Sequence, residues 1–376
     1  MILITGANGF VGKNLICRLE NLGYDGIETL SHIDDDEIIK DKCARADFVV
    51  HLAGVNRPVS QASYWTGNAD FTKTLIECLS SAGSGAPVIL SSSTQAVLDN
   101  AYGLSKREAE KIVDNYGKKA NVRVYIYRMP NVFGKWSRPN YNSAIATFCH
   151  NIANGLPITV NDVAHRMKLL YIDDIVTEFV EKIEENRTGK LPYLKREDPV
   201  EPIKSPVYEA TLGHVADIIG SFGDLRKTLD LPDLSDPLTS KLYSTYLSFL
   251  PKGDFSYRLD MKTDERGSFT EFLRTRLSGQ VSVNIAHPGI TKGQHWHDSK
   301  NEKFLVVSGE GLIRLRKIGE DDIIECPVSG TRMEVVEIPT GYTHSIMNTG
   351  NCDLVTVMWA NEAFDPSKPD TWHLEV

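Results

Sequence analysis

The spacing of apolar residues changes along the chain near residue 250. Before that point, short apolar runs alternate with stretches in which apolar residues recur at the spacing of an amphipathic helix. The runs read MILIT, GIETL, DFVVHLA, APVILSSS and VRVYIYRMP, and the helical stretches include KNLICRLENLG and SKREAEKIVDNYG. Strands that alternate with helices are typical of a doubly wound parallel sheet. We therefore predict an α/β domain over residues 1–250.

Beyond residue 250, apolar and polar positions alternate as they do in half-buried strands. The runs QVSVNIAH, KFLVVSGEGLIRLR, MEVVEIP and DLVTVMWA are separated by the Gly, Pro and Asn residues of turns. Residues 251–376 therefore favour an antiparallel β-sandwich or barrel. The stretch before them contains a polar, proline-rich loop at 194–206 and then ATLGHVADIIGSF, which predicts a helix capped by Thr211.

The composition suits a globular protein of two domains. A chain of 376 residues that is 41% hydrophobic can bury a core in each. The formal net charge of −9 argues against nucleic acid as a partner. No window supplies the roughly 18 apolar residues of a membrane span, and the amino terminus lacks the basic n-region of a signal peptide. The six cysteines form no CxxC pair, so we expect reduced thiols and a cytoplasmic location.

Three glycines follow the first apolar run in the motif GANGFVG. Gly6 permits a tight turn from strand to helix, Gly9 lets the backbone approach a pyrophosphate, and Gly12 allows the helix to pack closely on the strand. The free N–H groups at the start of the helix would then bind the phosphates. Because the motif stands between a strand and a helix, it predicts a Rossmann-like dinucleotide site.

The residues after the second apolar run bear on the choice of dinucleotide. NAD-selective sites usually have a carboxylate at the end of this strand, where it binds the ribose hydroxyls. Here Ser31 and His32 occupy that place, and the acidic run begins only at Asp34. We therefore favour NADPH over NADH, with His32 either beside the 2′-phosphate or simply exposed in the loop.

Tyr102 and Lys106 lie four residues apart in the helical stretch AYGLSK. On a helix their side chains share one face, about 6 Å apart. A nearby ammonium group lowers the pKa of a phenol and makes it a usable proton donor or acceptor. The serine cluster at 91–93 ends the preceding strand and offers a hydroxyl to a substrate carbonyl. The pattern therefore predicts proton transfer to a carbonyl oxygen.

Five motifs follow one another in residues 1 to about 190, namely GANGFVG, HLAG, the serine cluster, YGLSK and YRMPNVFG. In this order they resemble the extended short-chain dehydrogenases/reductases. The resemblance implies that Tyr102 donates a proton, that Lys106 binds the ribose and tunes Tyr102, and that Ser93 binds the carbonyl, with Ser92 or Thr94 as alternatives to Ser93. It also implies a substrate contact for Asn131. The implied cofactor-binding residues are Gly6, Asn8, Gly9, Phe10, Val11, Gly12, His32, Leu52, Ala53, Gly54, Tyr102 and Lys106.

A second candidate site lies in the β-rich part of the chain. GITKGQHWHDSKNEKFLVVSG and PTGYTHSIMN resemble the two motifs of the cupins. Alternate residues of a strand point the same way, so His295 and His297 face one interior, which Glu302 and His344 reach from neighbouring strands. Three imidazoles and a carboxylate suit Zn²⁺, Mn²⁺, Fe²⁺ or Ni²⁺. We therefore predict a metal-binding cupin barrel.

The segments DERGSFTEF and QVSVN resemble the opening of the nucleotide-sugar 3,5-epimerases, which are also cupins. That resemblance implies removal of a proton alpha to a 4-ketone, with a divalent cation stabilising the enolate oxygen. Zn²⁺ is the simple choice, because the chemistry needs no redox change. Arg266, Gln280 and Asn284 are candidates for substrate binding, with Arg266 at the diphosphate. Lys303 and Tyr342, close to proposed ligands, are candidates for proton transfer, although Lys303 is equally well explained as a solvated strand residue.

Together the two halves, with LYSTYLSFLP between them and PDTWHLEV after them, resemble the bifunctional capsular polysaccharide enzymes of the CapF type. The resemblance implies epimerisation at C3 of a UDP-2-acetamido-2,6-dideoxy-4-hexulose in the cupin domain. NADPH-dependent reduction at C4 in the first domain would then give UDP-2-acetamido-2,6-dideoxy-L-talose, and the enzyme would be a homodimer. The alternative is a nucleotide-sugar 4-reductase whose cupin serves only dimerisation or substrate recruitment.

Overall fold

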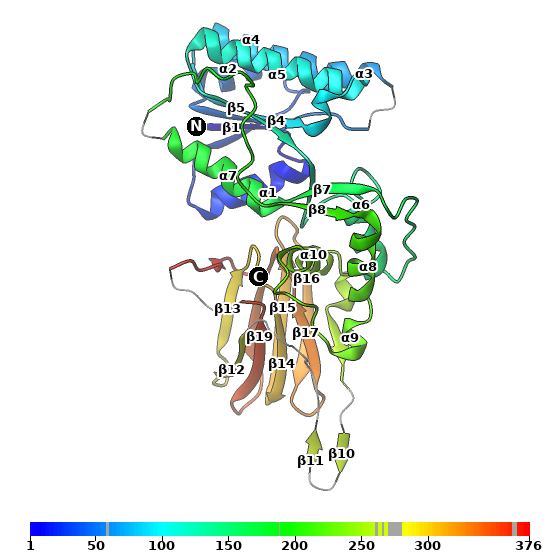
Figure 1. Ribbon diagram of the computed structural model, residues 1–376. Helices are drawn as coiled ribbons and strands as arrows, with labels where there is room; N and C mark the ends of the chain where they lie inside the picture. The colour runs from blue at the N-terminus through cyan, green and yellow to red at the C-terminus, as the bar shows by residue number, and fades with distance from the viewer. Residues whose placement is uncertain (58–59, 188, 260–261, 265–266, 270–279, 363–366) are drawn as a thin grey trace. The chain divides into compact units, whose positions relative to one another are not determined.

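The computed structural model describes residues 1–57, 60–187, 189–259, 262–264, 267–269, 280–362 and 367–376 (Figure 1). Contacts divide the chain into two compact units. The first comprises Met1–Ser143 and Met167–Glu209, and the second comprises Ala144–Arg166 and Ala210–Val376. The second unit thus includes helices that precede residue 250 in the chain, and a domain boundary at that residue stays a prediction.

The first unit is built on a five-stranded parallel sheet of order β2-β1-β3-β4-β5. Its strands are β1 (Ile2–Thr5), β2 (Ile27–Leu30), β3 (Phe48–His51), β4 (Val88–Ser93) and β5 (Val124–Met129). In Figure 1 one face of the sheet carries α2 (Asp36–Arg45), α4 (Phe71–Ser81) and α5 (Ala101–Ala120), and the other carries α1 (Phe10–Asn21) and α7 (Ile172–Glu185). Because helices cover both faces, the central strands β1, β3 and β4 each begin with at least three apolar residues. The predicted Rossmann-like α/β fold is confirmed.

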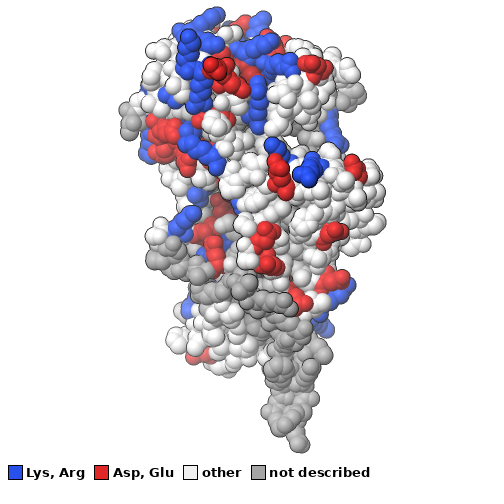
Figure 2. All heavy atoms as spheres, viewed as in Figure 1, with Lys and Arg blue, Asp and Glu red and all other residues white. Residues whose placement is uncertain are grey.

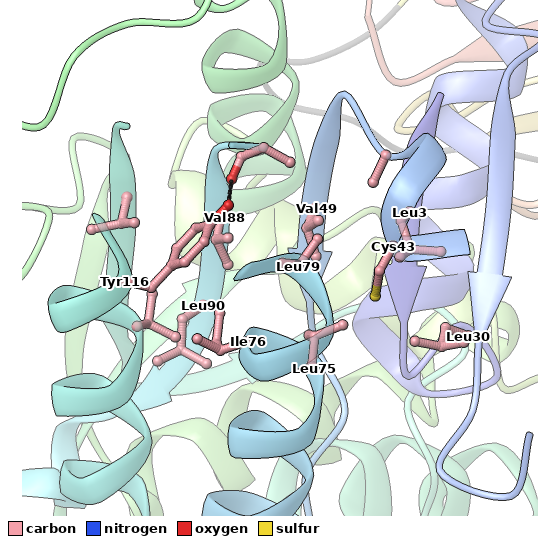
Figure 3. Packing of buried hydrophobic residues seen from close by; sticks show 14 of the residues in the cluster. Leu3, Leu30, Cys43, Val49, Leu75, Ile76, Leu79, Val88, Leu90 and Tyr116 are labelled. Atoms are coloured by element: carbon pink, nitrogen blue, oxygen red, sulfur yellow. Dashed lines mark hydrogen bonds between the residues drawn. The ribbon is translucent and has the colours of Figure 1, made fainter. Parts of the chain in front are cut away.

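The core of this unit lies between the sheet and α4. Leu3, Val49 and Val88 come from three strands and pack with Leu75 and Leu79 of α4 (Figure 3). All five side chains are fully shielded from solvent. This packing fixes the strands firmly, so the loops at their carboxyl ends start from defined positions.

Shorter elements complete the first unit. The helix α3 (Ala62–Tyr64) and the π-helix η1 (Trp65–Asp70) lead into α4, and the 3-10 helix η2 (Thr94–Val97) leads into α5. A separate three-stranded sheet contains β6 (Asn131–Phe133), β7 (Arg166–Tyr171) and β8 (Val207–Thr211), in that order, and the first residue of β7 and the last two of β8 count with the second unit.

The second unit contains two antiparallel five-stranded sheets, of order β12-β19-β14-β17-β9 and β16-β15-β18-β13-β20. The strands of the first are β9 (Ser256–Arg258), β12 (Gln280–Ala286), β14 (Glu302–Ser308), β17 (Glu334–Ile338) and β19 (Leu354–Ala360). Those of the second are β13 (Thr291–Trp296), β15 (Glu310–Lys317), β16 (Ile323–Ser329), β18 (Tyr342–Asn348) and β20 (Trp372–His373). The arrangement is consistent with the predicted cupin-like β domain.

Helices also belong to the second unit. They are α6 (Ala144–Ala153), α8 (Leu212–Phe222), α9 (Leu225–Thr228), α10 (Pro237–Leu247) and the 3-10 helix η3 (Lys252–Asp254), and a hairpin pairs β10 (Lys262–Asp264) with β11 (Gly267–Phe269). The predicted cap of α8 is present, because Thr211 Oγ1 accepts the N–H of His214 at 3.2 Å. Of the helices in the described part of the chain, none has the length and hydropathy for a membrane span. Basic and acidic side chains are intermixed on the face shown in Figure 2.

Candidate functional site

A cavity of about 1030 Å³ opens beyond the carboxyl ends of β1, β2 and β3. Its walls are the segments that follow these strands, together with η1 and the start of α4. In parallel sheets this edge is where ligands bind. The predicted cofactor residues that line the cavity are Gly6, Asn8, Gly9, His32, Leu52, Ala53 and Gly54.

The glycine turn has the geometry of a phosphate-binding loop. Gly6 has a φ of +68°, a conformation that residues with a Cβ rarely adopt. A Cβ at Gly12 would lie only 2.3 Å from the Gly6 carbonyl oxygen, so α1 and the turn are in close backbone contact. Phe10 and Val11 form the first turn of α1, and Gly9 caps it without a side chain. The N–H groups in the first turn of α1 are therefore available to an anion.

The end of β2 presents both signs of charge to the cavity. Ser31, His32, Asp34 and Lys42 all line it. The Asp34 carboxylate accepts the N–H of Ser31 at 2.9 Å and lies 3.9 Å from Lys42 Nζ. A carboxylate suits the ribose hydroxyls of NAD, and a lysine suits a 2′-phosphate. NADPH selectivity, and the place of His32 in it, stay predictions.

At the start of α5, Tyr102 is half-buried and Lys106 is buried. Asn100 caps this helix, its Oδ1 accepting the N–H of Gly103 at 2.7 Å. Burial raises the pKa of Tyr102, and a hydrogen bond with Ser93 opposes that rise. Lys106 Nζ donates to the Ser91 carbonyl at 3.0 Å, and burial lowers the pKa of Lys106 to about 8. A tyrosine that keeps its proton and a lysine that titrates near neutrality suit proton transfer.

Gly54 lies between Lys106 and the cavity. A Cβ on Gly54, which lines the cavity, would lie 2.9 Å from Lys106 Nζ and 2.8 Å from Asn68 Oδ1. Asn68 accepts the N–H of Val55 at 2.9 Å and donates to Ser105 Oγ at 3.0 Å. It thus ties the cavity wall to α5. Sequence analysis did not find Asn68, because its role depends on the π-helix that carries it.

Successive residues of a strand point to opposite faces of the sheet, so the candidate serines Ser92 and Ser93 of β4 face different sides. Ser92 donates a hydrogen bond to the buried carboxylate of Glu110. The same carboxylate accepts hydrogen bonds from two nitrogens of Arg128, at 2.7 and 2.9 Å. Ser93 lies on the opposite side of β4 and contacts Tyr102. Thr94 begins η2. The geometry therefore favours Ser93 over Ser92 as the hydroxyl beside Tyr102, and it adds Glu110 and Arg128, which sequence analysis missed.

The second unit brings the four predicted metal ligands together. His295 lies on β13, His297 follows that strand, Glu302 begins β14 and His344 lies on β18. One ligand atom from each lies within 4.8 Å of the others. Glu302 Oε2 is 3.3 Å from Nε2 of His297 and 3.3 Å from Nε2 of His344. Four converging N and O donors are a set that divalent transition metals accept.

The electrostatics of this cluster also fit a cation. Burial lowers the pKa of His295 to about 4 and lowers that of His344, so both rings are neutral at pH 7. Burial acts to raise the pKa of Glu302, but its contacts with His297 and His344 outweigh it and hold the carboxyl ionised. Within the described part of the chain, neither ring nitrogen of His344 has a well-directed hydrogen-bond partner. Neutral imidazoles and a carboxylate are the forms that bind metal.

The two cupin candidates for proton transfer lie elsewhere. Lys303 follows Glu302 on β14, so its side chain points to the opposite face of the sheet. There its ammonium group donates to the buried Glu337 carboxylate. The ring of Tyr342 packs edge-on against Phe255 at 4.9 Å, and burial raises its pKa to about 12. The structure does not bring either side chain into contact with the histidines.

The predicted substrate-binding residues are dispersed. Asn131 Nδ2 donates to the Lys168 carbonyl at 3.3 Å, and Asn284 Oδ1 accepts Lys292 Nζ at 2.8 Å. Arg266 lies outside the described residues, as does the side chain of Gln280 on β12. Their contacts with a substrate stay predictions.

Comparison with known proteins assigns the chain to a family. Residues 2–193 match the NAD dependent epimerase/dehydratase family, and residues 262–372 match the polysaccharide biosynthesis C-terminal domain. The chain therefore belongs to the NAD dependent epimerase/dehydratase family, and this membership implies a nicotinamide cofactor for the cavity of the first unit.

Two kinds of protein match this chain over its full length. The UDP-2-acetamido-2,6-beta-L-arabino-hexul-4-ose reductase of Pseudomonas aeruginosa (strain PA103) is 44% identical over 377 residues, which cover 100% of this chain and 98% of the relative. The crystal structure of the capsular polysaccharide assembling protein CapF from Staphylococcus aureus is 48% identical with a TM-score of 0.66, covering 100% of both chains. CapF crystallised with the inhibitor 3-isopropenyl-tropolone is 45% identical with a TM-score of 0.61, covering 100% of this chain and 99% of that one. The resemblance to the CapF type is confirmed.

Proposed function

We propose that the chain is a bifunctional nucleotide-sugar enzyme that epimerises C3 of a UDP-2-acetamido-2,6-dideoxy-4-hexulose and then reduces its C4 ketone. The product would be UDP-2-acetamido-2,6-dideoxy-L-talose. The observation that carries the proposal is the presence of two separate sets of chemically active side chains in two units. In the first unit Lys106, which shares α5 with Tyr102, adjoins the cavity wall at Gly54, and the cluster of three histidines and a glutamate lies in the second unit.

The first set suits reduction. A bound nicotinamide supplies the hydride that C4 receives. Tyr102 then donates its phenolic proton to the C4 oxygen, and Ser93 holds that oxygen by a hydrogen bond. The ammonium group of Lys106, next to Gly54 at the cavity wall, stabilises the phenolate that remains. We propose NADPH as the reductant, because Ser31 and His32 occupy the place at the end of β2 where NAD-selective sites usually have a carboxylate.

The second set suits epimerisation. Removal of the C3 proton, which is alpha to the 4-ketone, gives an enolate that is reprotonated on the other face. A divalent cation, with Zn²⁺ the proposed ion, supplies Lewis acidity toward the ketone oxygen. His295, His297, Glu302 and His344 would hold it, and His297 and His344 are buried.

The relatives support both halves. The Pseudomonas relative is named as the reductase of a UDP-linked 4-ketose, and the CapF inhibitor is a tropolone. Tropolones carry a carbonyl and a hydroxyl oxygen on adjacent carbons, a pair that chelates cations. This agrees with a metal in the cluster. We also propose a homodimer, on the resemblance to the CapF type.

One observation favours the alternative of a single-activity 4-reductase. Lys303 pairs with Glu337 and Tyr342 packs on Phe255, so neither candidate acid or base contacts the histidines. An epimerase needs such a group. If none exists, the β domain would serve only recruitment of the substrate or dimerisation.

Solvent exchange separates the two functions. The unaltered protein is incubated with the UDP-linked 4-keto sugar in D₂O without NADPH, and deuterium at C3 is measured by NMR and mass spectrometry. We expect label at C3, and its loss in His344→Ala. Tyr102→Phe should label C3 normally while losing about 100- to 10,000-fold in NADPH oxidation. Absence of label with the unaltered protein would refute the epimerase and leave the single-activity reductase.

A further inference from the structure

We propose that Asp370, through the segment Asp370–Val376 that it begins, positions the metal-binding side chains of the second unit. The inference rests on the proposed metal site and adds a residue that lies outside the two cupin motifs. Asp370 is a positioning residue here, because it contacts a ligand and the loop beside it and is not one of the four converging donors.

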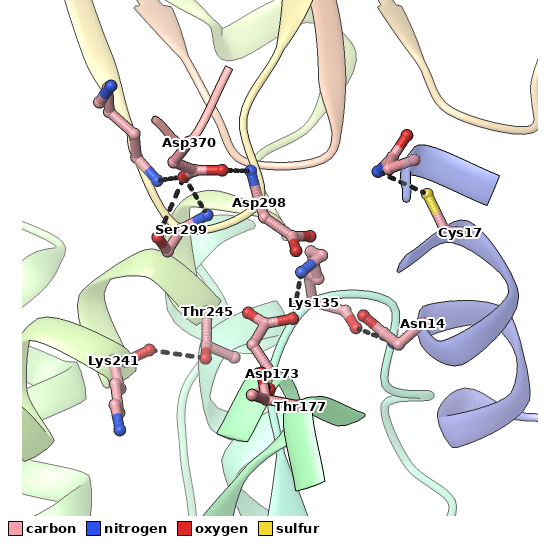
Figure 4. Close-up of polar contacts among 12 residues, drawn as sticks. Asn14, Cys17, Lys135, Asp173, Thr177, Lys241, Thr245, Asp298, Ser299 and Asp370 are labelled. Carbon is pink, nitrogen blue, oxygen red and sulfur yellow. Dashed lines mark hydrogen bonds and ion pairs between the residues drawn. The ribbon is translucent and has the colours of Figure 1, made fainter. Parts of the chain in front are cut away.

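The carboxylate of Asp370 organises the loop between two ligands. It accepts the N–H groups of Asp298 at 2.8 Å, Ser299 at 2.8 Å and Lys300 at 2.7 Å (Figure 4). It also accepts the hydroxyl of Ser299 at 3.0 Å. These donors follow His297 directly and precede Glu302. The turn that places both ligands is therefore held by a single anionic side chain from a distant part of the sequence.

The backbone of Asp370 sets the tautomer of a ligand. Its carbonyl oxygen accepts a hydrogen bond from Nδ1 of His297. An imidazole that donates through Nδ1 presents the lone pair of Nε2, and Nε2 of His297 is the nitrogen that faces Glu302 at 3.3 Å. Such a partner orients a metal-binding histidine and fixes its tautomer.

The rest of the segment fixes His295. β20 pairs with β13, so that His373 lies opposite His295. The N–H of Leu374 donates to the Gln294 carbonyl at 2.9 Å, and the N–H of Val376 donates to its Oε1 at 3.0 Å. Gln294 forms the irregularity in β13 between Gly293 and His295 and has a φ of +58°. The segment thus holds the bend that aims His295 as well as the turn after His297.

The test is metal affinity measured without turnover. The metal-free full chain, its Asp370→Asn variant and a control are titrated with Zn²⁺, and the visible absorption of Co²⁺ complexes reports ligand geometry. Asparagine keeps the size of the side chain but loses the anion that four donors share. We expect Asp370→Asn to bind Zn²⁺ about 10- to 100-fold more weakly, with an altered Co²⁺ spectrum. Asp370→Glu, which restores the charge, should recover part of the affinity.

Asp353→Asn is the matched control. Asp353 also accepts a hydrogen bond from a histidine, His287 at 2.7 Å, but its side chain is 50% exposed and away from the cluster. This variant should bind Zn²⁺ like the unaltered protein. If Asp370→Asn folds and keeps wild-type affinity and Co²⁺ spectrum, the inference is wrong although the metal site stands. No binding by the unaltered protein would refute the metal site itself, and the inference with it.

Ser299→Ala keeps the inference testable if Asp370→Asn does not fold. It removes only the hydroxyl bond at 3.0 Å and leaves the three N–H bonds. We expect about twofold to tenfold weaker Zn²⁺ binding, the size of one hydrogen bond. Unchanged affinity in folded Ser299→Ala would then overturn the inference.

Discussion

Gly12→Ala is a sharp test of the dinucleotide site, because the structure gives the size of the perturbation. The added Cβ would lie 2.3 Å from the Gly6 carbonyl oxygen and 2.8 Å from both Cα and O of Ala7. Ordinary contacts begin at 3.4 Å, so the turn and α1 would have to separate by 3.4 − 2.3 = 1.1 Å. All three atoms belong to the backbone, and no side-chain rotation relieves the overlap.

This separation displaces the N–H groups proposed to bind the cofactor phosphates. A misplacement of about 1 Å costs roughly 100-fold in rate, or about 2.8 kcal/mol. The overlap itself should cost about 1–3 kcal/mol of stability. We therefore expect kcat/KM for NADPH to fall about 100-fold, measured by the absorbance of NADPH. Metal content and deuterium exchange at C3 belong to the second unit and should not change.

Gly220→Ala is the control for the same chemical change. Gly220 lies in α8, and a Cβ there meets nothing within 4 Å. This variant should keep its activity and gain up to about 1 kcal/mol of stability from helix propensity. Wild-type kcat/KM in Gly12→Ala, with an unfolding midpoint unchanged from the unaltered protein, would show that close approach of helix and turn is not what builds the site.

Four further predictions follow from buried charges and from the metal. Lys106, with a pKa lowered to about 8, loses its proton as pH rises through that value, so kcat/KM for reduction should fall above about pH 8; a pH profile of Lys106→Arg that keeps the same limb would contradict this. Glu110→Ala removes the buried partner of Arg128, which is partly exposed and keeps Asp198 at 3.6 Å, and should cost about 1–3 kcal/mol in urea unfolding. Lys303→Met should likewise destabilise the fold, because Glu337 loses its buried partner, while C3 exchange per folded molecule stays normal; a selective loss of exchange would restore Lys303 as a catalytic residue. Removal of metal by a chelator should stop C3 exchange and leave NADPH reduction of the epimerised sugar intact; loss of both activities together would count against independent sites.

Much of the fold is predictable because its strands have strong local patterns. The buried strands β1 and β3 are almost entirely apolar, β4 begins with the apolar run VIL, and β14 and β17 are apolar runs bounded by turn residues. By contrast β16 contains Pro327 among mixed residues and was not predicted, and β20 has only two residues. Both exist because neighbouring strands supply their partners, and no local pattern carries that information.

Some residues of the candidate sites could likewise be predicted from the sequence, and others could not. The glycine motif, the pair Tyr102 and Lys106, and the metal ligands keep fixed spacings that a sequence displays directly. Asp370 does not, since 73 positions separate it from His297 and only the folded chain joins them. The position of Lys303 could have been predicted. Alternate residues of a strand share a face, which brings His295 and His297 together, and adjacent residues do not, so the side chain of Lys303 points away from that of Glu302.

The division of the chain into units has a consequence for dissecting the enzyme. The polypeptide passes from one unit to the other at Ser143, at Arg166 and at Glu209. A single scission at any peptide bond therefore leaves at least one fragment that lacks part of its own unit. Splitting this gene at residue 250 would deprive the β domain of α6, α8 and α10, so separately expressed halves should be poor surrogates for the intact catalyst.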